Sequence, residues 1–196
     1  TGYIIFAIWN GINDPVLGYF LDRPFKFTQK WGKRFPWVIG SILPWVFSFV
    51  LIFAVPHFSS SNAIWLYFTW LVVFTCLYDT FGSIYGVNRQ ALFPEKFRDP
   101  FERRTASTIV VFISFFGSIA GALIAPLLIT YGKPETYIPA ALIFAGMGVV
   151  CMIIMIPGHR ESPAMIKRAL NHPPPENFGK TLIFALKQKN FLSYVI

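Results

Sequence analysis

The chain has 196 residues, of which 55% are hydrophobic and 13% charged, and its formal net charge is +8. Soluble domains carry about 25% charged residues, so this composition excludes an ordinary soluble domain and indicates a membrane protein. The positive charge does not indicate a nucleic-acid partner. All of the 17 basic residues except Lys133 lie in or beside alternate connections between hydrophobic segments, as membrane topology requires.

Five hydrophobic segments are each long enough to cross a bilayer as a helix, which takes about 20 residues. We expect these helices at about residues 3–21, 35–55, 63–92, 107–130 and 137–157. Residues 158–190 are predicted to form a basic linker with one or two short amphipathic helices, and a further membrane helix is expected to start at 191–196. No strand-like alternation occurs, so the sequence predicts an all-α, polytopic membrane protein.

The distribution of basic residues also predicts the orientation of these helices. Under the positive-inside rule, the connection after residue 21, the connection after residue 92 and the linker face the cytoplasm. We therefore expect a multi-pass protein of the cell membrane, with the lipid bilayer as its surroundings.

The first segment has a polar face that is unusual for a membrane helix. Asn10, Asn13 and Asp14 share one side of a helical wheel and are followed by Pro15. A charge at the bilayer centre costs about 2.5–3.5 kcal/mol on insertion scales, so such residues normally face a cavity, a partner or an ion. Repair of the backbone hydrogen bond that Pro15 removes is the alternative, but repair needs donors and does not explain a carboxylate.

The third segment has a second polar face, which contains Thr75, Asp79, Gly82, Ser83, Gly86 and Gln90. Asp14 and Asp79 are the two acids that fall within hydrophobic segments. At 1.5 Å per residue they lie at similar depths, about 12 and 13 Å from the cytoplasmic ends of their helices. We expect both acids to border one cavity. The alternative for Asp79 is a hydrogen bond to a neighbouring helix.

Two stretches carry a resemblance to a known family. NDPVLGYFLDR at 13–23, followed by WGKRFPW at 31–37, resembles the second helix and following loop of the glycoside–pentoside–hexuronide:cation symporters, a melibiose-permease-like branch of the major facilitator superfamily. LFPEKFRDPFERRTAS at 92–107 resembles the loop between the fourth and fifth helices of that family. The resemblance implies a partial major facilitator bundle: helices two to six, the middle loop and the start of helix seven. A first helix and a C-terminal half would then be missing partners from the same protein.

The resemblance also implies a cation site between helices two and four. Asn10, Asn13 and Asp14 would be its second-helix ligands, although Asn10 stands where well-studied members carry a second Asp. The family's helix-four acid falls on Gly86, its nearby Thr on Ser83, its sugar-facing Trp on Gln90 and its helix-five Arg near Val111. We predict that the cation-coupling residues are Asp14, Asn10, Asn13, Ser83 and Asp79, and that the substrate cavity includes Gln90, Thr75 and Gly86.

A gate is implied at one end of the bundle. The residues Gly18, Asp22, Arg23, Gly32, Lys33 and Arg34 resemble the superfamily's cytoplasmic gate motif. There Asp22 would hold the inward side closed through ion pairs and a helix end. The alternative is topology alone, which explains the basic residues but neither Gly18 nor Asp22.

The sequence thus predicts a cation-coupled symporter of a small organic solute, such as a sugar or glycoside, that works by alternating access. A proton is favoured over sodium, because sodium needs several hard oxygen ligands and two of the three family carboxylates are replaced. The alternatives are a carrier of a lipid-like or other solute and a membrane sensor or receptor. The chain has no HExxH pair, GxSxG elbow or Cys/His cluster, so we predict no enzyme activity, no metal and no cofactor besides the coupling ion.

Overall fold

The computed structural model describes residues 2–23, 25–59, 63–171, 179 and 187–188, and every regular element over these residues is a helix. Five of the helices are long and apolar enough to cross a membrane. They are α1 (Gly2–Leu21), α3 (Phe35–Phe53), α4 (Ala63–Lys96), α5 (Pro100–Leu128) and α6 (Tyr137–His159). Three short elements join or follow them: α2 (Thr28–Trp31), the 3₁₀ turn η1 (Pro134–Thr136) and α7 (Pro163–Asn171). The predicted all-α class is confirmed.

The helices α4 and α5 are longer than their hydrophobic segments. α4 continues to Lys96, beyond the expected end at residue 92, and α5 begins at Pro100, before the expected start at 107. The Asp99 side chain accepts hydrogen bonds from the backbone nitrogens of Phe101 and Glu102 at 2.9 and 3.0 Å, which caps the start of α5. Pro100 suits the first helical position, where its missing N–H costs nothing. Local capping therefore extends α5 through a charged stretch that hydropathy marks as a loop.

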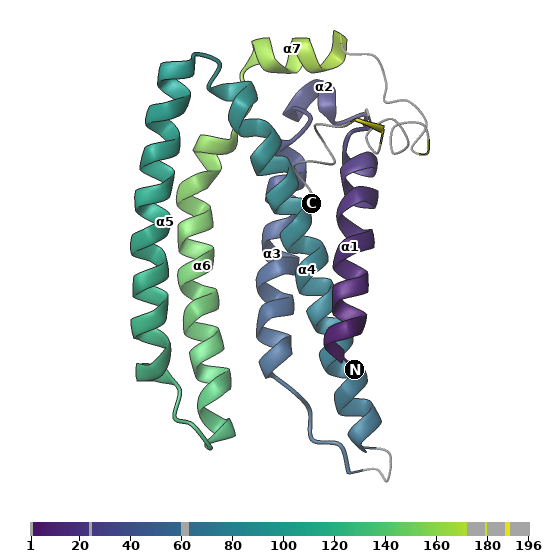
Figure 1. The fold of residues 1–196 in the computed structure, drawn as a ribbon, viewed down its shortest axis with the longest axis vertical. Helices are drawn as coiled ribbons and strands as arrows, with labels where there is room; N and C mark the ends of the chain where they lie inside the picture. Colours follow the sequence, from purple (N-terminus) through teal and green to yellow (C-terminus); the bar gives the residue numbers. More distant parts are fainter. Residues whose placement is uncertain (1, 24, 60–62, 172–178, 180–186, 189–196) are drawn as a thin grey trace.

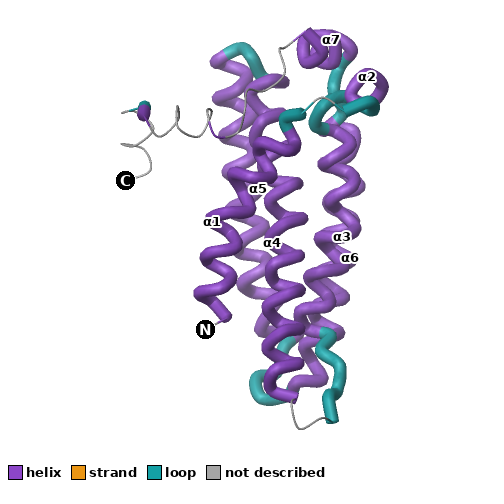
Figure 2. The backbone as a smooth tube through the Cα atoms, turned by 90° about the vertical axis from the view of Figure 1, so that its right-hand side faces the viewer, coloured by secondary structure: helices purple, strands orange, loops and turns teal. Residues whose placement is uncertain are grey.

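The long helices run side by side, with α3 and α4 between α1 on one side and the pair α5 and α6 on the other (Figure 1). In both views α1 lies along α4 (Figure 1 and Figure 2). The carboxyl ends of α1, α4 and α6 and the amino ends of α3 and α5 lie at one end of the bundle, and α7 lies across this end next to α2. We call this the α7 end. The basic connections predicted to share one side of the membrane meet there.

Of the predicted linker, residues 158–171 contain the end of α6 and all of α7. Apart from residues 179 and 187–188, the remainder of the linker and the expected helix start at 191–196 lie outside the described residues.

Close packing of α3 on α4 depends on one small residue. A Cβ atom at Gly82 would lie only 3.0 Å from Nε1 of Trp45, so the indole of α3 rests directly on the α4 backbone. The same indole stacks on Tyr85, with ring centroids 5.3 Å apart. Helix association in lipid relies on this kind of van der Waals contact, because lipid tails are as apolar as the side chains. The helices α1 and α5 expose large apolar side chains such as Ile12 and Phe112.

Candidate functional site

A polar seam joins α1 to α4 about midway along both helices. The Nδ2 atom of Asn10 donates to Oδ1 of Asp79 at 2.9 Å, and Nδ2 of Asn13 donates to Oδ2 at 3.3 Å. Beside them, Nε1 of Trp9 donates to Oγ1 of Thr80 at 3.2 Å. The carboxylate of Asp79 thus binds two amides of the neighbouring helix, one with each oxygen. We call Asn10, Asn13 and Asp79 the amide–carboxylate seam.

The chemistry of the seam fixes the orientation of both amides. Asn13 is 9% exposed and Asp79 is half-buried, whereas Asn10 is exposed. An ionised carboxylate only accepts hydrogen bonds, so each asparagine must turn its NH₂ group toward Asp79. Both amide oxygens are consequently directed away from the Asp79 carboxylate.

The structure does not bring Asp14 into this seam. Asp14 follows Asn13 on α1 and is therefore rotated by about 100° around the helix axis, away from Asp79. Its side chain is exposed and makes no hydrogen bond or ion pair with any described residue. The two intramembrane acids thus do not meet. Asp79 instead hydrogen-bonds to the neighbouring helix, which is the arrangement the sequence left as an alternative.

The other predicted site residues on α4 lie at different levels. Thr75 and Ser83 flank Asp79 by one turn on either side, are half-buried and form no side-chain hydrogen bond within the described chain. At Gly86, a Cβ atom would meet no described atom within 4 Å other than the adjacent residues and backbone of its own helix. Gln90 lies about 16 Å along the helix from Asp79, at 1.5 Å per residue. It lines a cavity of about 350 Å³ between α4 and α5 together with Arg89, Phe93, Ser107, Val110 and Val111.

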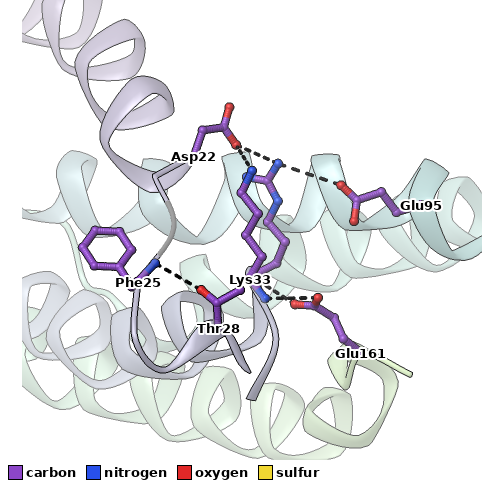
Figure 3. A network of polar contacts seen from close by, with 7 residues as sticks. Asp22, Phe25, Thr28, Lys33, Glu95 and Glu161 are labelled. Carbon is purple, nitrogen blue, oxygen red and sulfur yellow. Dashed lines mark hydrogen bonds and ion pairs between the residues drawn. The ribbon is translucent and has the colours of Figure 1, made fainter. Parts of the chain in front are cut away.

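A charged cluster connects three helices at the α7 end (Figure 3). Oδ1 of Asp22, just after α1, lies 3.0 Å from Nζ of Lys33 and 2.9 Å from Nη2 of Arg34. The same Nη2 atom lies 3.9 Å from a carboxylate oxygen of Glu95 on α4. Arg34 is only 8% exposed, so its charge depends on these partners. Asp22, Lys33 and Arg34 are brought together, as the gate motif implies.

Glu161 is a functional candidate that the sequence reasoning missed. Its carboxylate accepts hydrogen bonds from the backbone nitrogens of Lys33, Arg34 and Phe35 at 3.1, 2.6 and 3.0 Å. These N–H groups open α3, whose N-cap residue provides no side-chain cap of its own. Two signals were available: an acid almost directly after α6 in a basic linker, and no Ser, Thr, Asp or Asn among the four residues directly before Phe35 to cap that helix.

Gly32 is required by the same contact. Its φ is +93°, in the left-handed region that side-chain-bearing residues rarely adopt. A Cβ there would lie 2.5 Å from Cδ of Glu161. The glycine of the predicted gate therefore allows the linker carboxylate to reach the start of α3. Glu95, also missed, contributes from the end of α4.

Two predicted gate residues lie apart from the charged cluster. The Arg23 guanidinium turns back along its own helix, where Nη2 donates to the Tyr19 hydroxyl at 3.1 Å and the group lies 4.9 Å from the ring centroid. At Gly18, a Cβ atom would meet no described atom within 4 Å other than the adjacent residues and backbone of its own helix, so no described neighbour requires a small residue there.

The chain has five helices of membrane-spanning length, a carboxylate that is hydrogen-bonded to amides within the apolar part of these helices, and a basic end. These features define a multi-pass helical membrane protein. The chain matches the sequence profile of the MFS/sugar transport protein family over residues 1–193. It belongs to this family, and the resemblance to the cation symporters of the major facilitator superfamily is confirmed.

Several curated relatives are similar to the chain. An uncharacterized symporter of Synechocystis sp. is 29% identical over 67% of this chain and 24% of the relative. The sodium-dependent lysophosphatidylcholine symporter 1 of Xenopus tropicalis is 28% identical over 60% of this chain and 21% of the relative. The isoprimeverose transporter of Lactiplantibacillus pentosus is 26% identical over 96% of this chain and 38% of the relative. The chain thus spans less than half the length of these relatives.

Proposed function

We propose that the protein is a secondary active transporter that couples the movement of a cation to symport of a small organic solute by alternating access. The observation that carries this proposal is the amide–carboxylate seam, because ionisable side chains within membrane helices mark ion and substrate pathways. A sensor or receptor would have little need for a carboxylate that binds an adjacent helix at this depth.

The coupling cation is a proton rather than sodium. Sodium needs several converging oxygen ligands, whereas two NH₂ groups point at the Asp79 carboxylate and would repel a metal cation. A proton on Asp79 turns one of its acceptor oxygens into a donor. One of the two amide contacts must then rearrange, so protonation changes how α1 and α4 are joined. Asp14 lies on α1, like the two amides, and binds no described residue. It provides a second carboxylate that can take up the proton.

The proposed substrate is a sugar or glycoside, which is supported by the relative named as an isoprimeverose transporter. A lipid-like solute is the second candidate, because other relatives are named as lysophosphatidylcholine symporters and as a sphingosine-1-phosphate transporter. The cavity lined by Gln90 and Arg89 has polar and cationic groups that suit either a hydroxyl-rich or a charged head group.

The proposed orientation places the α7 end in the cytoplasm, because its connections carry nearly all of the basic residues. In this orientation Asp22, Lys33, Arg34 and Glu95 hold α1, α3 and α4 together on the cytoplasmic side. Opening toward the cytoplasm requires these ion pairs to separate.

Uptake by cells that express the full-length protein tests the proposal. Neutral glycosides and fluorescent lysophospholipids are offered under a proton gradient and, separately, under a sodium gradient. We expect proton-driven uptake that is lost in Asp14→Asn and Asp79→Asn, while membrane insertion is retained. Glu135→Gln, which neutralises an exposed acid at the opposite end of the bundle, is the matched control and should leave uptake unchanged. Uptake that needs neither gradient contradicts symport, and uptake that survives Asp14→Asn removes Asp14 from the coupling site.

A further inference from the structure

A cavity of about 120 Å³ opens at the α7 end, away from the amide–carboxylate seam. Its lining comes from three segments that are far apart in the sequence: the loop before α3, the end of α4, and α7. The lining residues are Lys33, Glu95, Arg98, Met165, Arg168 and Ala169. Three of these side chains are cationic and one is anionic, so the cavity carries an excess of positive charge.

Among the described residues, most of that positive charge is not neutralised. Arg98 is exposed and makes no hydrogen bond or ion pair with any described residue. The Nε atom of Arg168 donates to the carbonyl of Ala164 in its own helix at 3.2 Å, and its two terminal nitrogens bind no described residue. Glu95 is drawn toward Arg34, at 3.9 Å. Two guanidinium groups can therefore take an anion, and their planar donors match the oxygens of a phosphate group.

The position of α7 determines where such an anion would come from. Met165, Arg168 and Ala169 share one face of α7, at the i, i+3 and i+4 spacing, and this face lines the cavity. Lys167 and Leu170 are exposed. Because α7 lies across the end of the five long helices (Figure 1), it lies at the level of the lipid head groups when those helices span a bilayer. Basic pockets at this level bind anionic lipid head groups.

We propose that this cavity binds the phosphate group of an anionic phospholipid from the leaflet on the α7 side. The proposal requires that the long helices span a bilayer, but not that the protein transports a solute. Lys33 belongs both to this cavity and to the ion pair with Asp22. A phosphate in the cavity competes with Asp22 for Lys33 and so weakens the contact between α1 and the start of α3.

Native mass spectrometry of the full-length protein tests the site, with phosphatidylglycerol titrated against phosphatidylcholine. We expect the wild type to retain phosphatidylglycerol in preference to phosphatidylcholine. Arg98→Gln should lower the affinity for phosphatidylglycerol about tenfold, because a hydrogen bond to a charged group has about that effect. Adding Arg168→Gln should lower this affinity further. The matched controls are Arg104→Gln and Lys167→Gln. They remove the same charge from exposed positions that do not line the cavity and should leave retention unchanged.

Three outcomes would overturn the proposal. Equal loss of lipid in the cavity and control variants would mean that only net charge matters. Equal retention of phosphatidylcholine and phosphatidylglycerol would mean that no anion site exists. If inorganic phosphate binds with the same dependence on Arg98 while phosphatidylglycerol does not, the ligand is a soluble ion and the lipid assignment is wrong. Arg98→Lys, which keeps the charge but not the two-pronged donor, should bind with intermediate affinity even if a glutamine variant fails to fold.

Discussion

Replacing Asp79 by alanine removes the acceptor of both hydrogen bonds in the amide–carboxylate seam. Hydrogen bonds between helices of a membrane protein contribute about 0.6 kcal/mol on average and reach about 1.7 kcal/mol. The two bonds together therefore contribute about 1 to 3 kcal/mol to the free energy of unfolding. The bond from Asn10 is shorter, but Asn13 is more deeply buried, so we expect each amide to contribute a similar share.

A double-mutant cycle measures this contribution directly. Reversible unfolding in mixed micelles is followed for Asp79→Ala, Asn10→Ala, Asn13→Ala and the two double variants that pair Asp79→Ala with each asparagine change. We expect a coupling energy of about 0.6 to 1.7 kcal/mol for each pair. Asp79→Asn keeps one acceptor oxygen and should lose about half of the effect. Coupling energies of zero for both pairs would refute the argument that Asp79 joins α1 to α4.

The remaining predictions concern the α7 end. Glu161→Ala removes the acceptor for the N–H groups that open α3, so we expect the free energy of unfolding to fall by about 1 to 2 kcal/mol in a denaturation experiment, with Glu161→Gln losing less. Gly32→Ala should lower the melting temperature, because its positive φ costs about 1–2 kcal/mol and its Cβ displaces Glu161; an unchanged melting temperature would contradict this geometry. Asp22→Asn should change stability by less than about 1 kcal/mol, since its ion pairs are partly exposed. It should nevertheless speed hydrogen–deuterium exchange over residues 25–35, and unchanged exchange would show that Asp22 does not hold this end closed.

The fold follows from the sequence because hydropathy determines which segments enter lipid, and the helices α1, α3 and α6 begin and end close to the expected residues. Hydropathy places the carboxyl end of α4 too early and the start of α5 too late. Hydropathy reports residence in lipid, whereas Asp99 and Pro100 start α5 by local hydrogen bonding and backbone geometry in a charged stretch. A hydropathy criterion therefore does not detect the polar part of a helix that extends beyond the hydrocarbon.

The candidate site was only partly accessible from the sequence. Composition identified Asp14 and Asp79 as the acids within apolar segments, and the helical wheel placed Asn10 and Asn13 on a common face. The pairing across helices depends on the rotation of α1 against α4, which a single wheel does not contain. That rotation selects Asp79 as the partner of both amides and leaves Asp14 outside the seam.

The charged cluster was also predicted only in part from the sequence. The residues around Asp22 and Arg34 follow from a motif contained within one connection of the chain. Glu161 follows Lys33 by 128 residues in the sequence. The two residues are in contact because α6 ends beside the start of α3. A motif within one connection of the chain cannot predict a contact with a residue so distant in the sequence.

In the proposed function, a carboxylate within the helices couples proton binding to solute movement. The most direct test of this coupling is substrate-driven proton flux, measured as a pH change in proteoliposomes that contain the full-length protein and receive the solute identified by the uptake panel. We expect proton movement with the solute in the wild type and in Glu135→Gln, and none in Asp14→Asn or Asp79→Asn. Equal proton flux in the wild type and in both aspartate variants would contradict it.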